Sequence, residues 1–195
     1  MRCLILIIFT TLLLCACGGV KHTTTTAGYP RPGKANTFSY KKKGFRLTGN
    51  IIDTSVVYCY AYPADSPEYF NCYRFFATGQ VMCYSFYNQT IPFSIDSFAN
   101  SKSGNVGYYH VEDSIVRLEI LFGYPGFKSD GSGRGQIDNS YGIIDGTGIR
   151  FFVSHIGKGY HAGRLLKYKW CKQLKGSTHT FLKTNMYPQW FKPDW

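Results

Sequence analysis

Histidine and carboxylate side chains are the first candidates for chemistry in this chain. His110 and Glu112 lie two residues apart, so they share one face of a strand and could hold a metal ion or act as an acid–base pair. His155 and His161 flank a glycine loop, and these histidines also offer axial ligands for haem. The chain has no Gly-x-Ser-x-Gly elbow, no His-Glu-x-x-His motif and no phosphate loop. We therefore expect a protein that is not an enzyme, with no metal ion or other cofactor.

Cys17 is the next candidate, because it ends an uncharged apolar run at the N-terminus. Residues 4–14 are too short to cross a bilayer as a helix, which needs about 20 apolar residues. Their length is typical of an export signal. Residues 14–17 (LCAC) resemble the lipobox of bacterial lipoproteins. This resemblance implies cleavage before Cys17, a palmitate-type lipid anchor on it and, since Gly18 rather than Asp follows, the outer membrane. The alternative is an ordinary signal peptide with a chance cysteine.

Cysteine usage agrees with export to an oxidising compartment. Beyond Cys17, the chain carries Cys59, Cys72, Cys83 and Cys171. Four cysteines permit two disulfides with three possible connectivities. Unpaired, buried thiols are the alternative.

The chain is strongly basic, with a net charge of +11. Residues 21–46 hold seven basic residues and no acid, and residues 150–192 hold nine and no acid. In the envelope, the polyanions within reach are anionic lipid head groups, lipopolysaccharide and acidic glycans, so we expect no nucleic-acid partner. A basic surface that only faces solvent is the alternative.

Apolar residues recur with a period of two over most of the chain, which predicts β-strands. In residues 56–62 this period places Tyr58 and Tyr60 on one face. Residues 70–76 and 81–87 flank a short loop that contains glycine, which indicates a hairpin. Further strands are expected at residues 91–95, 107–111, 115–122, 135–138, 141–144, 149–155 and 163–173.

These strands predict an all-β domain, an antiparallel up-and-down barrel of about eight to ten strands, because closure removes exposed sheet edges. Residues Val116, Leu118, Ile120 and Phe122 are expected to form a dry face opposite Arg117 and Glu119. A two-sheet β-sandwich is the alternative. The expected organisation is a signal peptide at 1–16, a flexible tether at 17–36, a barrel domain at 37–183 and an aromatic tail at 184–195.

Three passages resemble small lipocalin-like (calycin) bacterial lipoproteins: residues 73–81 (YRFFATGQV), 107–120 (GYYHVEDSIVRLEI) and 141–152 (YGIIDGTGIRFF). The Gly-x-Trp motif of lipocalins is absent, and residues 45–49 (FRLTG) stand in its place. The resemblance implies a lipid-anchored protein that binds a small hydrophobic or amphipathic ligand inside the barrel.

Aromatic side chains are the candidates for lining that binding site. They are Tyr58, Tyr60, Phe75, Tyr84, Tyr109, Phe122, Tyr168 and Trp170. The alternative is that they simply fill the barrel as its core. Arg74 and Arg117 are candidates for binding a carboxylate or phosphate of the ligand, although Arg117 also fits a solvent-facing pair with Glu119.

The C-terminal residues suggest a second class of function, an interaction or adaptor lipoprotein. Tyr187, Trp190, Phe191 and Trp195 lie close together in sequence. Aromatic residues with a polar atom are enriched at interfaces. This tail is therefore expected to bind an envelope protein, lie at the membrane surface or plug the end of the barrel.

Overall fold

The computed structural model describes residues 20–33, 38, 51–61, 69–87, 95–123, 133–152 and 178–195. Cys17 and the expected signal peptide lie outside these ranges. The described strands are β1 (Val20–Thr24), β2 (Pro30–Pro32), β3 (Val57–Ala61), β4 (Tyr69–Phe75), β5 (Gln80–Tyr87), β6 (Asn105–Glu112), β7 (Ile115–Gly123), β8 (Gly133–Ile144), β9 (Gly148–Phe152) and β10 (Thr178–Lys183). A 3₁₀ helix, η2, spans Ile95–Phe98. Among the described residues, no helix has the length and apolarity needed to cross a membrane.

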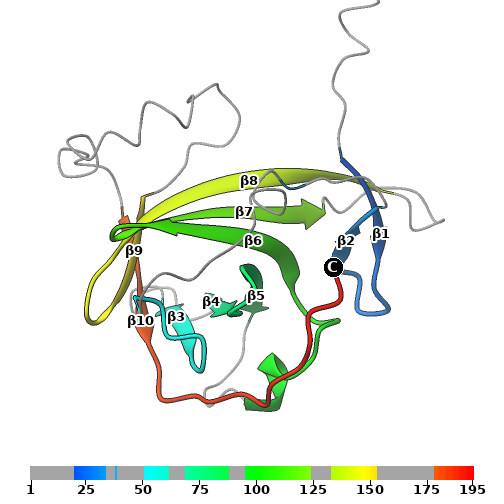
Figure 1. Cartoon of the computed structure of the whole chain (residues 1–195). Coiled ribbons are helices and arrows are strands. Elements are labelled where there is room, and N and C mark those ends of the chain that lie inside the picture. The colour runs from blue at the N-terminus through cyan, green and yellow to red at the C-terminus, as the bar shows by residue number, and fades with distance from the viewer. Residues whose placement is uncertain are drawn as a thin grey trace, which may run out of the picture.

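Strands β3 to β10 form a closed antiparallel barrel. Each pairs with the next along the chain, and β10 pairs back with β3 through Leu182↔Cys59 and Lys183↔Tyr58. The eight strands therefore make an up-and-down barrel (Figure 1), as the alternation predicted, and the sandwich is excluded. This topology is compatible with a lipocalin-like fold.

The predicted alternation of dry and wet faces holds around the barrel wall. Val116, Leu118 and Ile120 on β7 point into the interior, and the half-buried Phe122 packs beside them. Every strand of the barrel contributes to this apolar cluster, and β8 does so only through Ile144 at its C-terminal end. The other members from the remaining strands are Tyr58, Phe75, Val81, Cys83, Tyr109, Ile149, Phe151 and Phe181. Burial of these side chains supplies the main driving force for closing the sheet.

The two ends of the barrel differ. At one end, which we name the closed end, the strands are joined by tight turns at residues 76–79, 113–114 and 145–147. Gly79 and Asp113 take the positive φ angles, 86° and 56°, that such turns need. Ile52 and Val56, just before β3, add to the interior core at this end. At the other end, which we name the open end because its connections are longer, the strands are joined by residues 62–68, 88–104, 124–132 and 153–177.

The barrel wall is also apolar on its outer face, over β3 to β6. Val57, Cys72, Met82, Tyr84 and Val106 pack there with Phe98 of η2. Phe191 and Trp195 of the tail pack against this outer cluster. In Figure 1 the tail (red) runs from β10 past η2 to β2. The tail therefore covers a surface that would otherwise be exposed to water.

Several element boundaries differ from expectation. Residues 135–138 and 141–144 belong to one long strand, β8, because β7 pairs with it continuously from Ile115↔Ile143 to Gly123↔Gly135. The closing strand β10 was missed, although Thr178, Thr180 and Phe181 follow a strand-like pattern. Ile95, expected in a strand, begins η2. The strand expected at 163–173 lies outside the described residues.

The expected tether is wrong for residues 20–32. These residues form the hairpin β1–β2, and β1 also pairs with the start of β8 through Val20↔Gly135 and His22↔Gly133. Composition predicted disorder because the segment has few large apolar side chains. Main-chain hydrogen bonds to an existing strand edge stabilise it instead.

Candidate functional site

Three of the expected lining residues belong to the core at the closed end. Phe75 contacts Tyr58 and Tyr109 edge to face, with ring centroids 5.6 and 5.0 Å apart. The Tyr109 hydroxyl donates to the main-chain oxygen of Phe76 at 2.8 Å, and the Tyr58 hydroxyl accepts from the amide of Asp53 at 2.9 Å. Burial raises the pKa of Tyr109. These residues fill the closed end and hold its turns.

Two other expected residues, Tyr60 and Phe122, lie inside the barrel towards the open end, where side chains are half-buried. Tyr60 stands edge to face with His179 of β10 at 4.7 Å. Tyr73 of β4 is the register partner of Tyr58 and contacts the buried Phe181 at 4.7 Å. Phe181 also contacts Tyr60 at 5.6 Å, so these rings extend the closed-end core towards Tyr60. The alternation that singled out Tyr60 would also have found Tyr73, which faces the interior from the neighbouring strand β4, opposite Tyr58.

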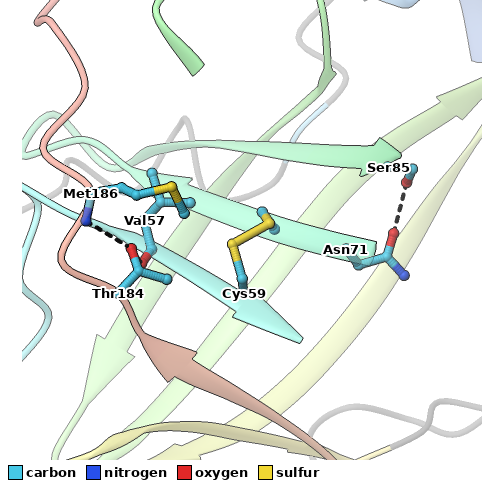
Figure 2. The surroundings of a disulfide bond; sticks show 7 residues. Val57, Cys59, Asn71, Ser85, Thr184 and Met186 are labelled. Carbon is cyan, nitrogen blue, oxygen red and sulfur yellow. Dashed lines mark hydrogen bonds between the residues drawn. A yellow bond between two sulfur atoms is a disulfide. The ribbon is translucent and has the colours of Figure 1, made fainter. Parts of the chain in front are cut away.

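Polar side chains share this part of the interior. The hydroxyl of Ser85 donates to Asn71 Oδ1 at 2.7 Å, between neighbouring strands β4 and β5 (Figure 2). Gln136 Nε2 donates to Asp138 Oδ1 at 3.1 Å. Asp138 is placed in the interior by its register with Ile120, and burial raises the pKa of its carboxyl. The open end therefore combines aromatic surface with hydrogen-bonding groups.

These polar residues were not singled out from the sequence. The signal was present, because Asn71 has the parity of Phe75 on β4, and Asp138 has the parity of Ile144 on β8. A polar residue on the dry side of a strand is informative, since its burial is costly without a partner.

The expectation that Tyr84 lines the interior is wrong. It lies opposite Cys72 in the β4–β5 register and on the outer face, where it packs against Phe98 with centroids 5.1 Å apart. Both faces of β5 are apolar, so hydrophobicity did not distinguish inside from outside. Tyr168 and Trp170 lie outside the described residues.

Both arginines expected to meet a ligand lie on the outside of the barrel. Arg117 forms an ion pair with Glu112 at 2.7 Å, rather than the expected pair with Glu119. Arg74 is 3% exposed and is buried beneath the tail. Neither therefore provides a positive charge inside the barrel.

One disulfide is present among the described cysteines, between Cys59 and Cys72 (Figure 2). These residues are direct neighbours across β3 and β4 on the outer face, where Met186 of the tail packs nearby. Cys83 is a buried free thiol in the interior, and burial raises its pKa to about 12, so it is protonated and unreactive. Cys171 lies outside the described residues.

Arg74 fastens the tail to the barrel. Its guanidinium donates to the main-chain oxygens of Phe98 and, at 2.8 Å, Gln189. It also lies between two rings, 5.1 Å from the centroid of Phe76 and 4.8 Å from that of Phe191. Burial lowers the pKa of Arg74. Carbonyl oxygens and aromatic faces together replace the water that this cation loses.

The tail divides into residues that face the barrel and residues that face solvent. Phe191 and Trp195 pack on the wall, and the Trp195 indole donates to the main-chain oxygen of Gly107 at 3.2 Å. Tyr187 and Trp190 are 62% and 71% exposed. The expectation that the tail plugs the end of the barrel is wrong, because it lies along the outer wall.

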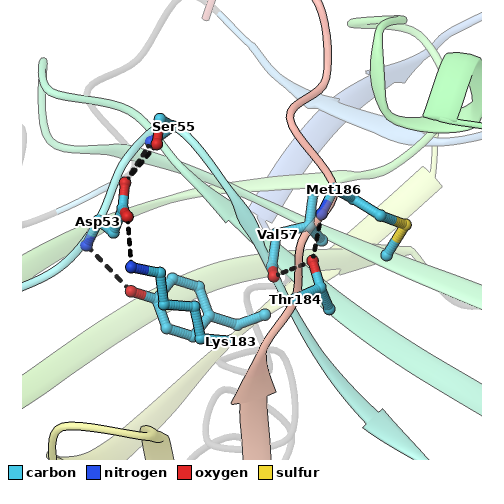
Figure 3. A network of polar contacts seen from close by, with 7 residues as sticks. Asp53, Ser55, Val57, Lys183, Thr184 and Met186 are labelled. Carbon is cyan, nitrogen blue, oxygen red and sulfur yellow. Dashed lines mark hydrogen bonds and ion pairs between the residues drawn. The ribbon is translucent and has the colours of Figure 1, made fainter.

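The start of the tail is joined to the residues before β3 by a polar network (Figure 3). Lys183 Nζ lies 2.5 Å from Asp53 Oδ2, and Ser55 donates to the same carboxylate. Thr184 donates its hydroxyl to the main-chain oxygen of Val57 at 2.7 Å. The network ties β10 and the tail to the closed end.

No metal cluster supports the histidine candidates within the described ranges, where no three His, Cys, Asp or Glu side chains gather. His110 and Glu112 lie on the outer face of β6, and His155 and His161 fall outside the described residues. Comparison with protein families, with curated protein sequences and with solved structures finds no match.

Replacing Arg74 with alanine should destabilise the fold by about 3 kcal/mol, because buried carbonyl oxygens lose their charged donor. The loosened tail should also be cut faster by chymotrypsin after Trp190. Urea unfolding and timed proteolysis measure the two effects. The matched control is Arg117→Ala, which removes a pair with the exposed Glu112 and should cost less than about 1 kcal/mol. Equal losses of stability and equal rates of proteolysis in the two variants would show that Arg74 does not hold the tail on the barrel.

Stability should depend on pH through Asp53. Hydrogen bonds from Lys183 and Ser55 lower the pKa of this carboxyl from 3.8 to about 2. Because the folded pKa lies below the unfolded value, the carboxylate stabilises the fold above pH 3.8 and loses this effect as the pH falls towards 2. The urea midpoint of Asp53→Asn should therefore lie below that of wild type at pH 7, and the difference should shrink as the pH falls from 3.8 through 2. Lys183→Met should show the same convergence, and a gap that stays constant over this range would contradict the assignment.

Proposed function

We propose that the protein is a lipid-anchored protein of the cell envelope, in the outer membrane, that binds a small amphipathic ligand without catalysing a reaction. The lipobox-like residues 14–17 support the anchor. An eight-stranded closed barrel supports the binding role, because a barrel of this size is wide enough for one small ligand. Its topology agrees with the resemblance to lipocalin-like lipoproteins.

The observation that carries the proposal is the contrast between the two halves of the interior. Tyr58, Phe75 and Tyr109 fill the closed end and are almost fully buried. Tyr60 and Phe122, towards the open end, are only half-buried, and their register partners are the polar residues Asn71 and Gln136. Ligand sites typically combine apolar surface with a few polar groups that fix orientation.

The ligand is inferred to have a flat or chain-like apolar part and a polar head. The apolar part packs against Tyr60, Tyr73 and Phe122. The head hydrogen-bonds to Asn71 and Asp138. A carboxylate at this depth favours a head group with hydrogen-bond donors or a positive charge, such as a zwitterionic lysophospholipid.

A bulky side chain on the inner face of β8 should fill part of the interior and weaken ligand binding. Ser140 pairs in register with the buried Leu118 and faces the interior, whereas its neighbour Asn139 is exposed. Ser140→Phe should therefore weaken binding of a lysophosphatidylethanolamine with a fluorescent acyl chain at least tenfold, measured by fluorescence titration. The matched control Asn139→Phe should bind as wild type does.

Tyr60→Ala provides a second variant, because it removes a half-buried ring at the edge of the core, where Tyr60 contacts Phe181. It should weaken binding and also lower the urea midpoint through the lost packing, so circular dichroism is used to check that the variant is folded in the binding assay. Absence of binding by the wild type, or equal binding by Ser140→Phe and Asn139→Phe, would refute the proposal.

The anchor is tested separately in the cells that express the protein. Wild type should take up an alkyne-tagged palmitate and partition with membranes, whereas Cys17→Ser should do neither. Cys15→Ser is the matched control, and it should still be labelled because Ala16 remains before Cys17. Labelling of Cys17→Ser would place the lipid elsewhere.

A second candidate function is partner binding through the tail. The exposed rings of Tyr187 and Trp190 favour it, because large aromatic side chains are enriched at interface centres. The two functions separate by mutation: Ser140→Phe would affect only the ligand, and Trp190→Ala only the partner.

A further inference from the structure

The hairpin β1–β2 fixes the chain to the barrel much closer to Cys17 than a tether would. Arg31 of β2 donates to the main-chain oxygens of Ser101 and, at 2.9 Å, Gly104. Thr25, in the turn between the strands, donates to the main-chain oxygen of Lys102 at 2.9 Å. Together with the β1–β8 pairing, these bonds hold the described chain on the domain from Val20 onwards.

The point of attachment lies at the open end. Val20 pairs with Gly135, near the start of β8, and β8 runs from there to Ile144 at the closed end. A strand rises about 3.3 Å per residue, so the closed-end turn lies about 30 Å further along β8.

The reach of the anchor is much shorter than that distance. Three peptide units separate Cys17 from Val20. Fully extended, they span about 10 Å. Cys17 therefore lies within about 10 Å of Val20 and stays about 20 Å or more from the closed-end turn, measured along β8.

We propose that the anchor holds the open end of the barrel at the bilayer surface, with the closed end pointing away, so that the ligand is a membrane amphiphile taken up from that bilayer. This inference rests on the lipid anchor and the ligand site of the proposed function. It adds an orientation and a source for the ligand, which neither the barrel topology nor the lipobox-like sequence contains alone.

The same geometry indicates on which side of the barrel the exposed rings of the tail lie. Arg74 holds the tail over β4, and β4 is four strands away from β8 when counted in either direction around the barrel. Tyr187 and Trp190 therefore lie across the barrel from the attachment point. They face away from the anchor's side of the barrel and are available to a protein partner.

Fluorescence quenching in vesicles tests the orientation. The lipidated protein is reconstituted with a genetically encoded fluorescent amino acid at Lys102, before β6 at the open end, or at Gly146, in a closed-end turn. Both positions are exposed, and a Cβ at Gly146 meets no atom within 4 Å. A phospholipid with a nitroxide on its head group should quench the label at Lys102 several-fold more than the label at Gly146. Equal quenching, or stronger quenching at Gly146, would overturn the orientation.

A linker variant shows whether the short anchor is the cause. Twenty Gly/Ser residues inserted between Gly19 and Val20 add an average reach of about 25 Å. The difference in quenching between Lys102 and Gly146 should then disappear. Its persistence would mean that something other than the anchor orients the barrel, and would overturn the inference.

The rate of ligand transfer tests whether the ligand is taken up from the bilayer. A fluorescent lysophosphatidylethanolamine held in the same vesicles should reach the anchored wild type several-fold faster than the linker variant, and equal rates would overturn direct uptake from the bilayer. Failure of the proposed function appears differently. A chain without acyl label lacks the anchor, and a chain that does not bind the soluble probe lacks the ligand site, whereas a lipidated, binding-competent chain with equal quenching at both ends contradicts only the orientation.

Discussion

The structure depends on one constraint: the barrel wall from β3 to β6 is apolar on both faces. The inner face closes on itself, but the outer face needs other parts of the chain to cover it. Helix η2 and the C-terminal tail provide this cover, and Arg74 joins them through hydrogen bonds to the main chain of each. A buried cation is stabilised only while these partners stay in place, so the clamp couples the tail to the folding of the barrel.

The interior shows a division of labour along the barrel axis. At the closed end, aromatic rings pack face to edge and their hydroxyls satisfy main-chain groups of the turns, which combines core packing with a fixed end geometry. Towards the open end, the inward-facing rings of Tyr60, Phe122 and His179 are only half-buried. Solid packing at one end can maintain the fold without equally tight packing at the other.

Much of the barrel could be predicted from the sequence, because alternation directly reports which face of a strand is buried. The strands around Tyr58 and Val116 were found in this way, and so was the hairpin turn at Gly79. The side assigned to Tyr84 was wrong for a physical reason: when both faces of a strand are apolar, the pattern loses its contrast. The inward-facing Asp138 could not be recognised from the alternation of apolar residues, because it is polar although it lies on the buried face of β8.

The ends of the chain were the least predictable parts. The hairpin β1–β2 is held by main-chain hydrogen bonds and by Arg31, and main-chain pairing leaves little trace in composition. The course of the tail depends on contacts between Phe191 and residues more than a hundred positions earlier. No local pattern contains such information.

The separation of tight turns from long connections also has an evolutionary consequence. Substitutions or insertions in the connections 62–68 and 124–132 leave the turns at Gly79 and Asp113 unchanged, because the two groups lie at opposite ends of the strands. Selection can therefore alter the rim of the barrel while the framework keeps its stability. The same arrangement makes the chain a usable scaffold for engineered recognition, with variable segments grafted at one end and folding information kept at the other.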